Sequence, residues 1–283
     1  MSTDVAPGGA LQSYIDKWLA VQPQQRIALS FVDPRQYPGH IALAALEQEL
    51  LGAAYGIREP QVAAAKLNWW AEELAGAAAS GGRHPLTQVL FDDERAHAIA
   101  GERWLAPVLA AMAQLEEGTA ADFAAQVAAA TQLHGALAAL ETSWWYGDGV
   151  SCERAARAAV LSHLLHALLR LEEDAERDRL PLPMARLARY SLSRAQLHKA
   201  SAEREEAIRA QLSDLASAWR EAERLPGPLS VFRGLESRHG NRMTLRAAKS
   251  AEPLAALRKA QLWQGPSVAW RAWQAARAWR QTQ

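Results

Sequence analysis

Proline and glycine divide this 283-residue chain into segments that are dominated by Ala, Leu, Glu and Arg. These residue types are strong helix formers. The sequence has no alternating β-branched runs joined by Asn-Gly or Asp-Gly turns, which are the usual signal of a β-hairpin. The pattern therefore predicts an all-α fold.

Proline, glycine and capping residues mark the ends of the predicted helices. Helices are expected over residues 40–55, 60–79, 101–115 and 201–222, and a short helix is expected from Pro85. Thr119 and Asp122 are expected to begin a helix that runs to about Trp144, and further helices follow Pro228. The segment from Ser151 to about Arg177 is expected to form the longest helix, which Pro181 and Pro183 end.

The domain organisation is expected to be simple. The sequence shows no internal repeat and no low-complexity linker. A single helical domain over residues 1–283 is therefore predicted, ending in a basic, Trp-rich helix at about residues 266–281.

The cellular compartment is suggested by what the sequence lacks. No run approaches the roughly 20 apolar residues that span a bilayer, and Met1 to Ala10 do not have the pattern of a secretory signal. Cys152 is the only cysteine, so no intrachain disulfide can form. A cytoplasmic protein is expected.

Charge is unevenly distributed along the chain. Eight basic residues and one acidic residue between Asn241 and Gln283 give +7, which leaves −7 on residues 1–240. Such an end suits an anionic membrane surface, a nucleic acid or an acidic partner, or it packs on the acidic remainder of the chain. No nucleic-acid-binding motif is present, so a nucleic acid is not expected as a partner, whereas peripheral contact at the inner membrane remains compatible with the Trp and Arg content.

Common catalytic signatures are absent. The sequence has no Gly-rich phosphate loop, no Gly-x-Ser-x-Gly elbow and no His-Glu-x-x-His motif. Two Glu-x-x-His spacings, Glu94/His97 and Glu236/His239, lie in polar stretches and are interpreted as chance matches to a di-iron pattern.

A polar stripe on the predicted 151–177 helix is the main candidate site. His163, His166, Arg170 and Asp174 follow one another at spacings of three, four and four, so they share a helix face beside several leucines. Buried polar groups must be paired or must serve a site. The stripe is either solvated, made of paired core histidines, or part of a ligand site; a zinc site would need a third ligand that the sequence does not supply.

Three segments resemble the squalene/phytoene synthase family. Glu173-Asp-Ala-Glu-Arg-Asp-Arg-Leu-Pro-Leu-Pro is similar to the family's second Asp-rich region, and Ala63-Ala-Ala-Lys-Leu-Asn-Trp-Trp-Ala-Glu-Glu-Leu with His84-Pro85 is similar to its Arg-Leu-x-Trp-Trp…His-Pro segment. Pro253-Leu-Ala-Ala-Leu and Trp270-Arg-Ala-Trp resemble the tail of a divergent branch that includes a mitochondrial assembly factor for respiratory complex I. The resemblance covers about residues 25–280 and implies an isoprenoid-synthase-like helical bundle around a central cavity.

This sequence departs from the family in its metal-binding carboxylates. The resemblance implies two facing Asp-rich motifs that hold Mg²⁺ against a substrate diphosphate. The first motif would fall on about Leu51 to Gly56, where there is no carboxylate; Glu47 and Glu49 are nearby, and Tyr55 lies within the segment. In the second motif Arg170 replaces the first Asp, and Glu173 with Asp174 remain as weak metal-ligand candidates.

Two functions are compatible with these departures. In the first, the protein is a non-catalytic family member. Its cavity either binds an isoprenoid or other anionic, lipid-like ligand through Arg170, His163 and His166, or is filled with side chains. Such a protein would act as a binding protein or assist the assembly of a membrane complex, and no cofactor is expected. In the second, Glu47, Glu49, Glu173 and Asp174 hold Mg²⁺ for a prenyl-diphosphate transferase or phosphatase. In either case Trp69 is a core residue or part of an apolar ligand wall.

Overall fold

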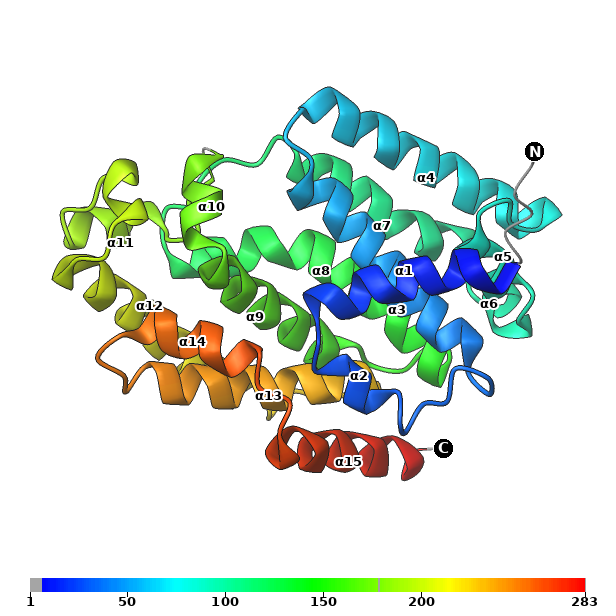
Figure 1. The fold of residues 1–283 in the computed structure, drawn as a ribbon. Coiled ribbons are helices and arrows are strands. Elements are labelled where there is room, and N and C mark those ends of the chain that lie inside the picture. Colours follow the sequence, from blue (N-terminus) through cyan, green and yellow to red (C-terminus); the bar gives the residue numbers. More distant parts are fainter. Residues whose placement is uncertain (1–6, 178, 283) are drawn as a thin grey trace.

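Prolines and capping side chains begin most helices of the computed structural model, which describes residues 7–177 and 179–282 (Figure 1). Asp178, in the second motif-like segment, and the first residues of the chain lie outside this description. Six helices have proline in their first turn, where its missing N–H leaves no helical hydrogen bond unmade. Others begin at side-chain caps such as Ser201, which accepts from the Arg204 N–H.

The described residues form no β-strand, which confirms the predicted all-α class. They form the helices α1 (Pro7–Val21), α2 (Gln25–Ala28), α3 (Pro38–Leu51), α4 (Pro60–Ser80), α5 (Pro85–Phe91), α6 (Glu94–Ala98), α7 (Gly101–Gln114), α8 (Phe123–Tyr146), α9 (Glu153–Leu169), α10 (Leu171–Glu176), α11 (Met184–Arg189), α12 (Ala202–Ala222), α13 (Val231–Ala247), α14 (Pro253–Gln261) and α15 (Pro266–Arg280), the π-helical turn η1 (Gly52–Gly56) and the 3₁₀ turn η2 (Arg194–His198).

The predicted longest helix is wrong, because the backbone leaves the helix at Arg170 (φ −98°, ψ 15°) and divides the segment into α9 and α10. Glu172, Glu173 and Asp174 then lie in the first turn of α10, the end of a helix at which negative charge is favourable. Among the described helices α8 is the longest, with 24 residues.

Two further features differ from the sequence-based expectation. Asp122, not Thr119, caps α8 by accepting from the Ala125 N–H at 2.8 Å. No element is predicted before Pro34, yet α1 and α2 occupy that stretch. α2 has no side-chain cap and is only four residues long, so little local signal marks it.

The helices pack around a central group in which α8 lies between α7 and α9, and α13 contacts α9, α12 and α15 (Figure 1). One hydrophobic cluster lies between α3, α4, α5, α7 and the second half of α8 and includes Trp70, Trp104 and Trp144. A second cluster lies between α9, α12, α14 and the end of α13 and includes Trp219. No described helix is long and apolar enough to cross a bilayer.

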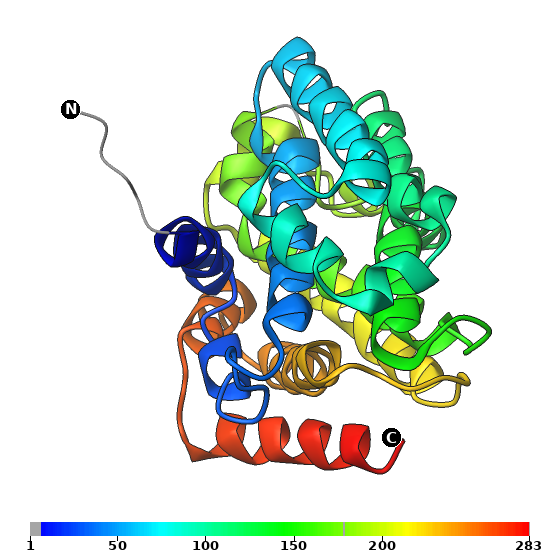
Figure 2. The ribbon, with the colours of Figure 1, turned by 90° about the vertical axis from the view of Figure 1, so that its right-hand side faces the viewer.

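The C-terminal helix α15 lies across α13 and α2 at one edge of the molecule (Figure 2). Its tryptophans have different environments: Trp279 is buried against Tyr37 and Trp145, whereas Trp270 is 58% exposed. The helix is therefore attached to the body through one face and presents Trp270 on the other.

Candidate functional site

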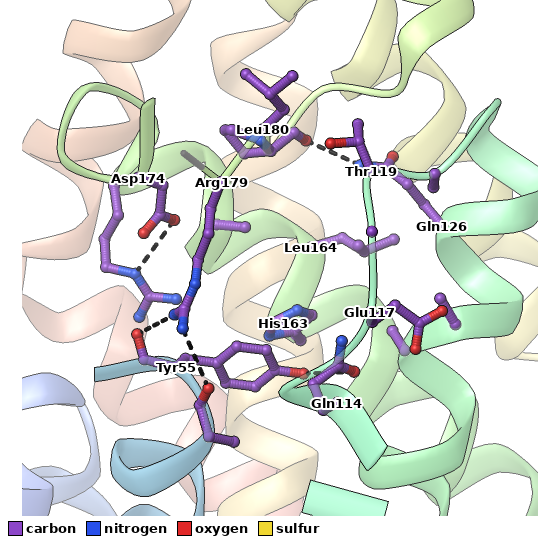
Figure 3. Close-up of a pocket in the computed structure, with 18 residues that line it drawn as sticks. Tyr55, Gln114, Glu117, Thr119, Gln126, His163, Leu164, Asp174, Arg179 and Leu180 are labelled. Atoms are coloured by element: carbon purple, nitrogen blue, oxygen red, sulfur yellow. Dashed lines mark hydrogen bonds and ion pairs between the residues drawn. The ribbon is translucent and has the colours of Figure 1, made fainter. Parts of the chain in front are cut away.

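A cavity of about 260 Å³ lies where the end of α3, the loop between α7 and α8, and the α9–α10 junction meet (Figure 3). Its apolar part is lined mainly by alanines and leucines from α8, α9 and the segment after α10. Its polar lining consists of Tyr55, Gln114, Glu117, Thr119, Gln126, His163, Arg170, Asp174 and Arg179.

A stack of three rings passes through the side of the cavity nearest the core. The Tyr55 and His163 ring centroids are 4.6 Å apart, and those of His163 and His134 are 4.2 Å apart. The Tyr55 hydroxyl donates to Gln114 Oε1 at 3.2 Å and lies 3.4 Å from His134 Nε2. These contacts hold Tyr55 and His163 in place, so the stack forms a fixed wall.

The histidines of this region are neutral at physiological pH. Burial and the nearby Arg170 charge lower the pKa of His163 to about 3 and that of His166 to about 4. Burial and the His163 ring also lower the pKa of His134 well below its usual value. Binding of an anion through charged His163 and His166, as the sequence stripe suggested, is therefore not favoured, and the positive charge of the site comes from arginine.

Two arginines lie at the polar end of the cavity. Arg170 Nε is 3.8 Å from the Asp174 carboxylate, and the Arg170 side chain is 38% exposed. Burial raises the pKa of Asp174, although Arg170 and Arg179 oppose this effect. Arg170 thus keeps most of its donors directed to the cavity and the solvent.

Arg179 joins the two motif-like segments directly. Its guanidinium donates to the backbone carbonyls of Tyr55 and Ala54 (Figure 3). The last carbonyls of a helix have no partner within the helix, and here the π-helical turn η1 presents two of them to Arg179. The position at which the resemblance implies metal-binding carboxylates therefore holds carbonyl oxygens that an arginine satisfies.

Glu47 lies outside the lining of this cavity, in a buried ionic network. Arg233 donates to Glu47, Glu141 and Glu236 at distances from 2.8 to 3.0 Å, and its side chain is 5% exposed. Burial raises the pKa of Glu236 to about 7, even though Arg233 opposes the shift. His166 Nδ1 lies 3.9 Å from Glu236, so His166 belongs to this network more than to the cavity lining.

Three other predicted site residues lie elsewhere. Glu49 accepts from Lys66 and Lys17, at 2.8 and 3.4 Å. Trp69 is 41% exposed and packs against Trp70 and His84. Glu173 is exposed on α10.

The structure brings together only part of the predicted set. Tyr55, His163, Arg170 and Asp174 line the cavity, whereas Glu47, Glu49, His166, Glu173 and Trp69 do not. The sequence patterns missed His134, which has no spacing signal on α8, and Arg179, which stands next to the acidic segment that was recognised.

The acidic residues present do not fit a magnesium cluster. Glu47, Glu49, Glu173 and Asp174 belong to separate environments, and the described part of the chain contains no group of three or more His, Cys, Asp or Glu side chains that could hold a metal ion. Magnesium needs several oxygen ligands in octahedral geometry, and Asp174 is the only one of the four at the cavity.

Comparisons with known proteins agree on one family and one fold. The sequence model described as squalene/phytoene synthase matches residues 24–274. The structure is similar to squalene synthase HpnC from Alicyclobacillus acidocaldarius, with a TM-score of 0.60 and 14% identity over 89% of this chain and 95% of that chain. It is also similar to a dehydrosqualene synthase in complex with ligand, with a TM-score of 0.63 and 10% identity over 89% of this chain and 98% of that chain. No curated protein matches this sequence.

Proposed function

Because this chain belongs to the squalene/phytoene synthase family and has its all-α isoprenoid synthase fold, we propose that its central cavity binds an anionic, isoprenoid-type ligand without metal ions and without synthase activity. Arg170 binds the anionic group, and the alanines and leucines of α8 and α9 contact the apolar chain.

The observation that carries this proposal is that arginines, and not a set of carboxylates, occupy the polar end of the cavity, with Arg170 at the position of an expected Asp. Arg179 satisfies the Ala54 and Tyr55 carbonyls, and Arg170 leaves donors free beside Asp174. An arginine forms charge-assisted hydrogen bonds to phosphate without a bridging cation. Removing ligands that act together through a metal cluster removes most of its catalytic effect.

The cavity size supports a small ligand. Its volume of about 260 Å³ is just below the range of roughly 300–1,000 Å³ that is usual for small-molecule sites. The Tyr55–His163–His134 stack closes the side that faces the core. A short prenyl chain with its phosphate at Arg170 suits these dimensions better than a long one.

Calorimetric titration of geranyl and farnesyl diphosphate into the protein, with and without Mg²⁺, tests the proposal. Binding without Mg²⁺ is expected. Arg170→Gln should weaken it about tenfold or more, since a hydrogen bond to a charged group contributes about 1.5–3 kcal/mol. Arg157→Gln, which removes the same charge from the surface of α9 away from the cavity lining, should leave binding unchanged.

Three outcomes would contradict the proposal. Binding that requires Mg²⁺ and is lost in Asp174→Ala would indicate a working metal site. Release of diphosphate or a prenyl product would indicate an active enzyme. No binding under either condition would leave the fold without a ligand in this cavity.

A further inference from the structure

A second cavity, of about 380 Å³, lies between α13, α14 and α15, outside the site described above. Four basic side chains from these three helices line it: Arg242, Arg246, Lys259 and Arg271. The cavity is referred to below as the basic groove. Figure 1 shows its three helices together along one edge of the molecule.

The basic groove has no acidic residue in its lining. None of its four cations forms an ion pair within the described residues, whereas Arg258, also on α14, is paired with Glu172 at 2.8 Å. Burial and the charges of Arg246 and Arg242 lower the pKa of Arg271. The cations thus repel one another, and a bound anion would relieve this repulsion.

A buried histidine in the lining of the groove lacks a partner. His239 is 5% exposed, and neither of its ring nitrogens has a hydrogen-bond partner among the described residues. The Ala260 carbonyl lies near the ring but outside hydrogen-bond geometry. Burial and the Arg271 charge lower the pKa of His239 to about 4. The neutral imidazole therefore has no well-formed hydrogen bond among the described residues, and buried polar groups left unpaired are uncommon.

Large apolar side chains stand beside these charges. Leu262 is 75% exposed, Trp263 55% and Trp270 58%. Gln261 Nε2 donates to the Val21 carbonyl at 3.4 Å, and Val21 is 44% exposed. Leu262 and Trp263 lie together in the connection between α14 and α15, and Trp263 lines the groove. These two residues are referred to below as the apolar border.

The indole of Trp263 has a fixed position in this border. It lies against the backbone of Gly265, where a Cβ atom would overlap the ring. Exposure of Trp263 is therefore a property of the folded connection between α14 and α15. A tryptophan held beside arginines and a lysine is typical of proteins that lie on a lipid surface.

We propose that the basic groove binds the phosphate of an anionic phospholipid, while Leu262 and Trp263 enter the boundary between headgroups and acyl chains. A free phosphate would engage the four cations and His239 but gives no role to Leu262 and Trp263. A nucleic acid would not explain Leu262, the most exposed of these side chains. An anionic bilayer fits both the charges and the apolar border.

Co-sedimentation of the full chain with vesicles tests this inference. Binding is expected to phosphatidylcholine vesicles that contain 25% phosphatidylglycerol, to be absent with phosphatidylcholine alone, and to weaken at high salt. Arg242→Gln/Arg271→Gln should lower the partition coefficient about 30-fold, because each charge near the surface contributes a factor of about five. Arg220→Gln/Arg224→Gln, which removes two exposed charges at and just after the end of α12, should lower it by less than about threefold.

A second variant tests the apolar border. Leu262→Ser/Trp263→Ser retains every charge of the groove and should lower binding to the anionic vesicles about tenfold or more. Far-UV circular dichroism of each variant confirms that the helices are retained. The inference is overturned if the α12 variant loses as much binding as the groove variant.

Two further arms distinguish other ligands. Inorganic phosphate and a 20-nucleotide single strand are titrated into the same proteins. The inference is overturned if phosphate binding is lost in Arg242→Gln/Arg271→Gln while vesicle binding is unchanged in Leu262→Ser/Trp263→Ser. That result would assign the groove to a free anion. Tighter binding of the oligonucleotide than of the vesicles would also overturn it.

Discussion

Arg233 Nη2 lies 2.9 and 2.8 Å from the two carboxylate oxygens of Glu47, although 186 residues separate them in the chain. The same guanidinium donates to Glu141 on α8 and to Glu236 on α13. One buried cation therefore links α3, α8 and α13. Glu47, one of the acids near the expected first motif, is held by an arginine instead of a metal ion.

Replacing Arg233 should strongly destabilise the protein. Arg233→Met keeps the length of the side chain but leaves Glu47, Glu141 and Glu236 without their cation. Breaking a buried pair on one side typically lowers the free energy of unfolding by about 3–5 kcal/mol. Urea unfolding followed by circular dichroism measures the change. Arg238→Met, on the exposed face of the same helix, is the control, and equal losses in the two variants would contradict the network's importance.

Replacing Arg179 should loosen the end of α3. Arg179→Gln leaves the Ala54 and Tyr55 carbonyls without the guanidinium, and an unsatisfied buried acceptor costs about 1–3 kcal/mol. Faster hydrogen exchange is expected for amides of Gly52–Gly56 and for the last turn of α3. Arg189→Gln, exposed on α11, provides the comparison. Unchanged exchange in Arg179→Gln would show that these contacts do not hold the turn.

Two glycine substitutions on one helical segment should act in opposite directions. At Gly39 a Cβ atom would overlap the ring of Trp144, which is 1% exposed, so Gly39→Ala should destabilise by about 1–3 kcal/mol. At Gly52 nothing lies within 4 Å and the backbone is helical. Gly52→Ala should therefore stabilise by roughly 0.5–1 kcal/mol. Thermal unfolding of both variants measures the difference, and a shared sign would refute the packing argument.

The buried His163 should make the protein less stable in acid. Its pKa falls from 6.5 to about 3 on folding, chiefly through burial. The unfolded chain binds this proton below pH 6.5 and the folded protein only near pH 3, so stability that is present above pH 6.5 is lost as the pH falls through this window. The loss is about 1.4 kcal/mol per pH unit for one proton.

The measurement for His163 compares slopes and not absolute stabilities. In His163→Gln the free energy of unfolding should depend on pH between 6 and 4 less steeply, by about 1.4 kcal/mol per unit. The exposed His97→Gln is the matched control. An unchanged slope in His163→Gln would mean that the ring accepts a proton in the folded state.

The candidate site was only partly predictable from the residues. Helical spacing grouped His163, His166, Arg170 and Asp174, and three of these four, His163, Arg170 and Asp174, line the cavity. The spacing did not reveal that α9 ends before Arg170 or that burial keeps His163 neutral. It also did not reveal that Arg179 donates to the backbone carbonyls of Ala54 and Tyr55. Each of these depends on neighbours from distant parts of the sequence.

The sequence by itself determined the all-α class, the family and most helix ends. Helix propensity, proline in the first turn and side-chain caps act within about four residues, so they can be read along the chain. Only the tertiary structure decided which charges meet. Glu47 pairs with Arg233 of α13, and Glu49 pairs with Lys17 and Lys66. The four cations of the basic groove come from three helices, and no acidic residue lines that groove. Side-chain type fixes what a residue can bind, whereas burial and packing fix what it does bind.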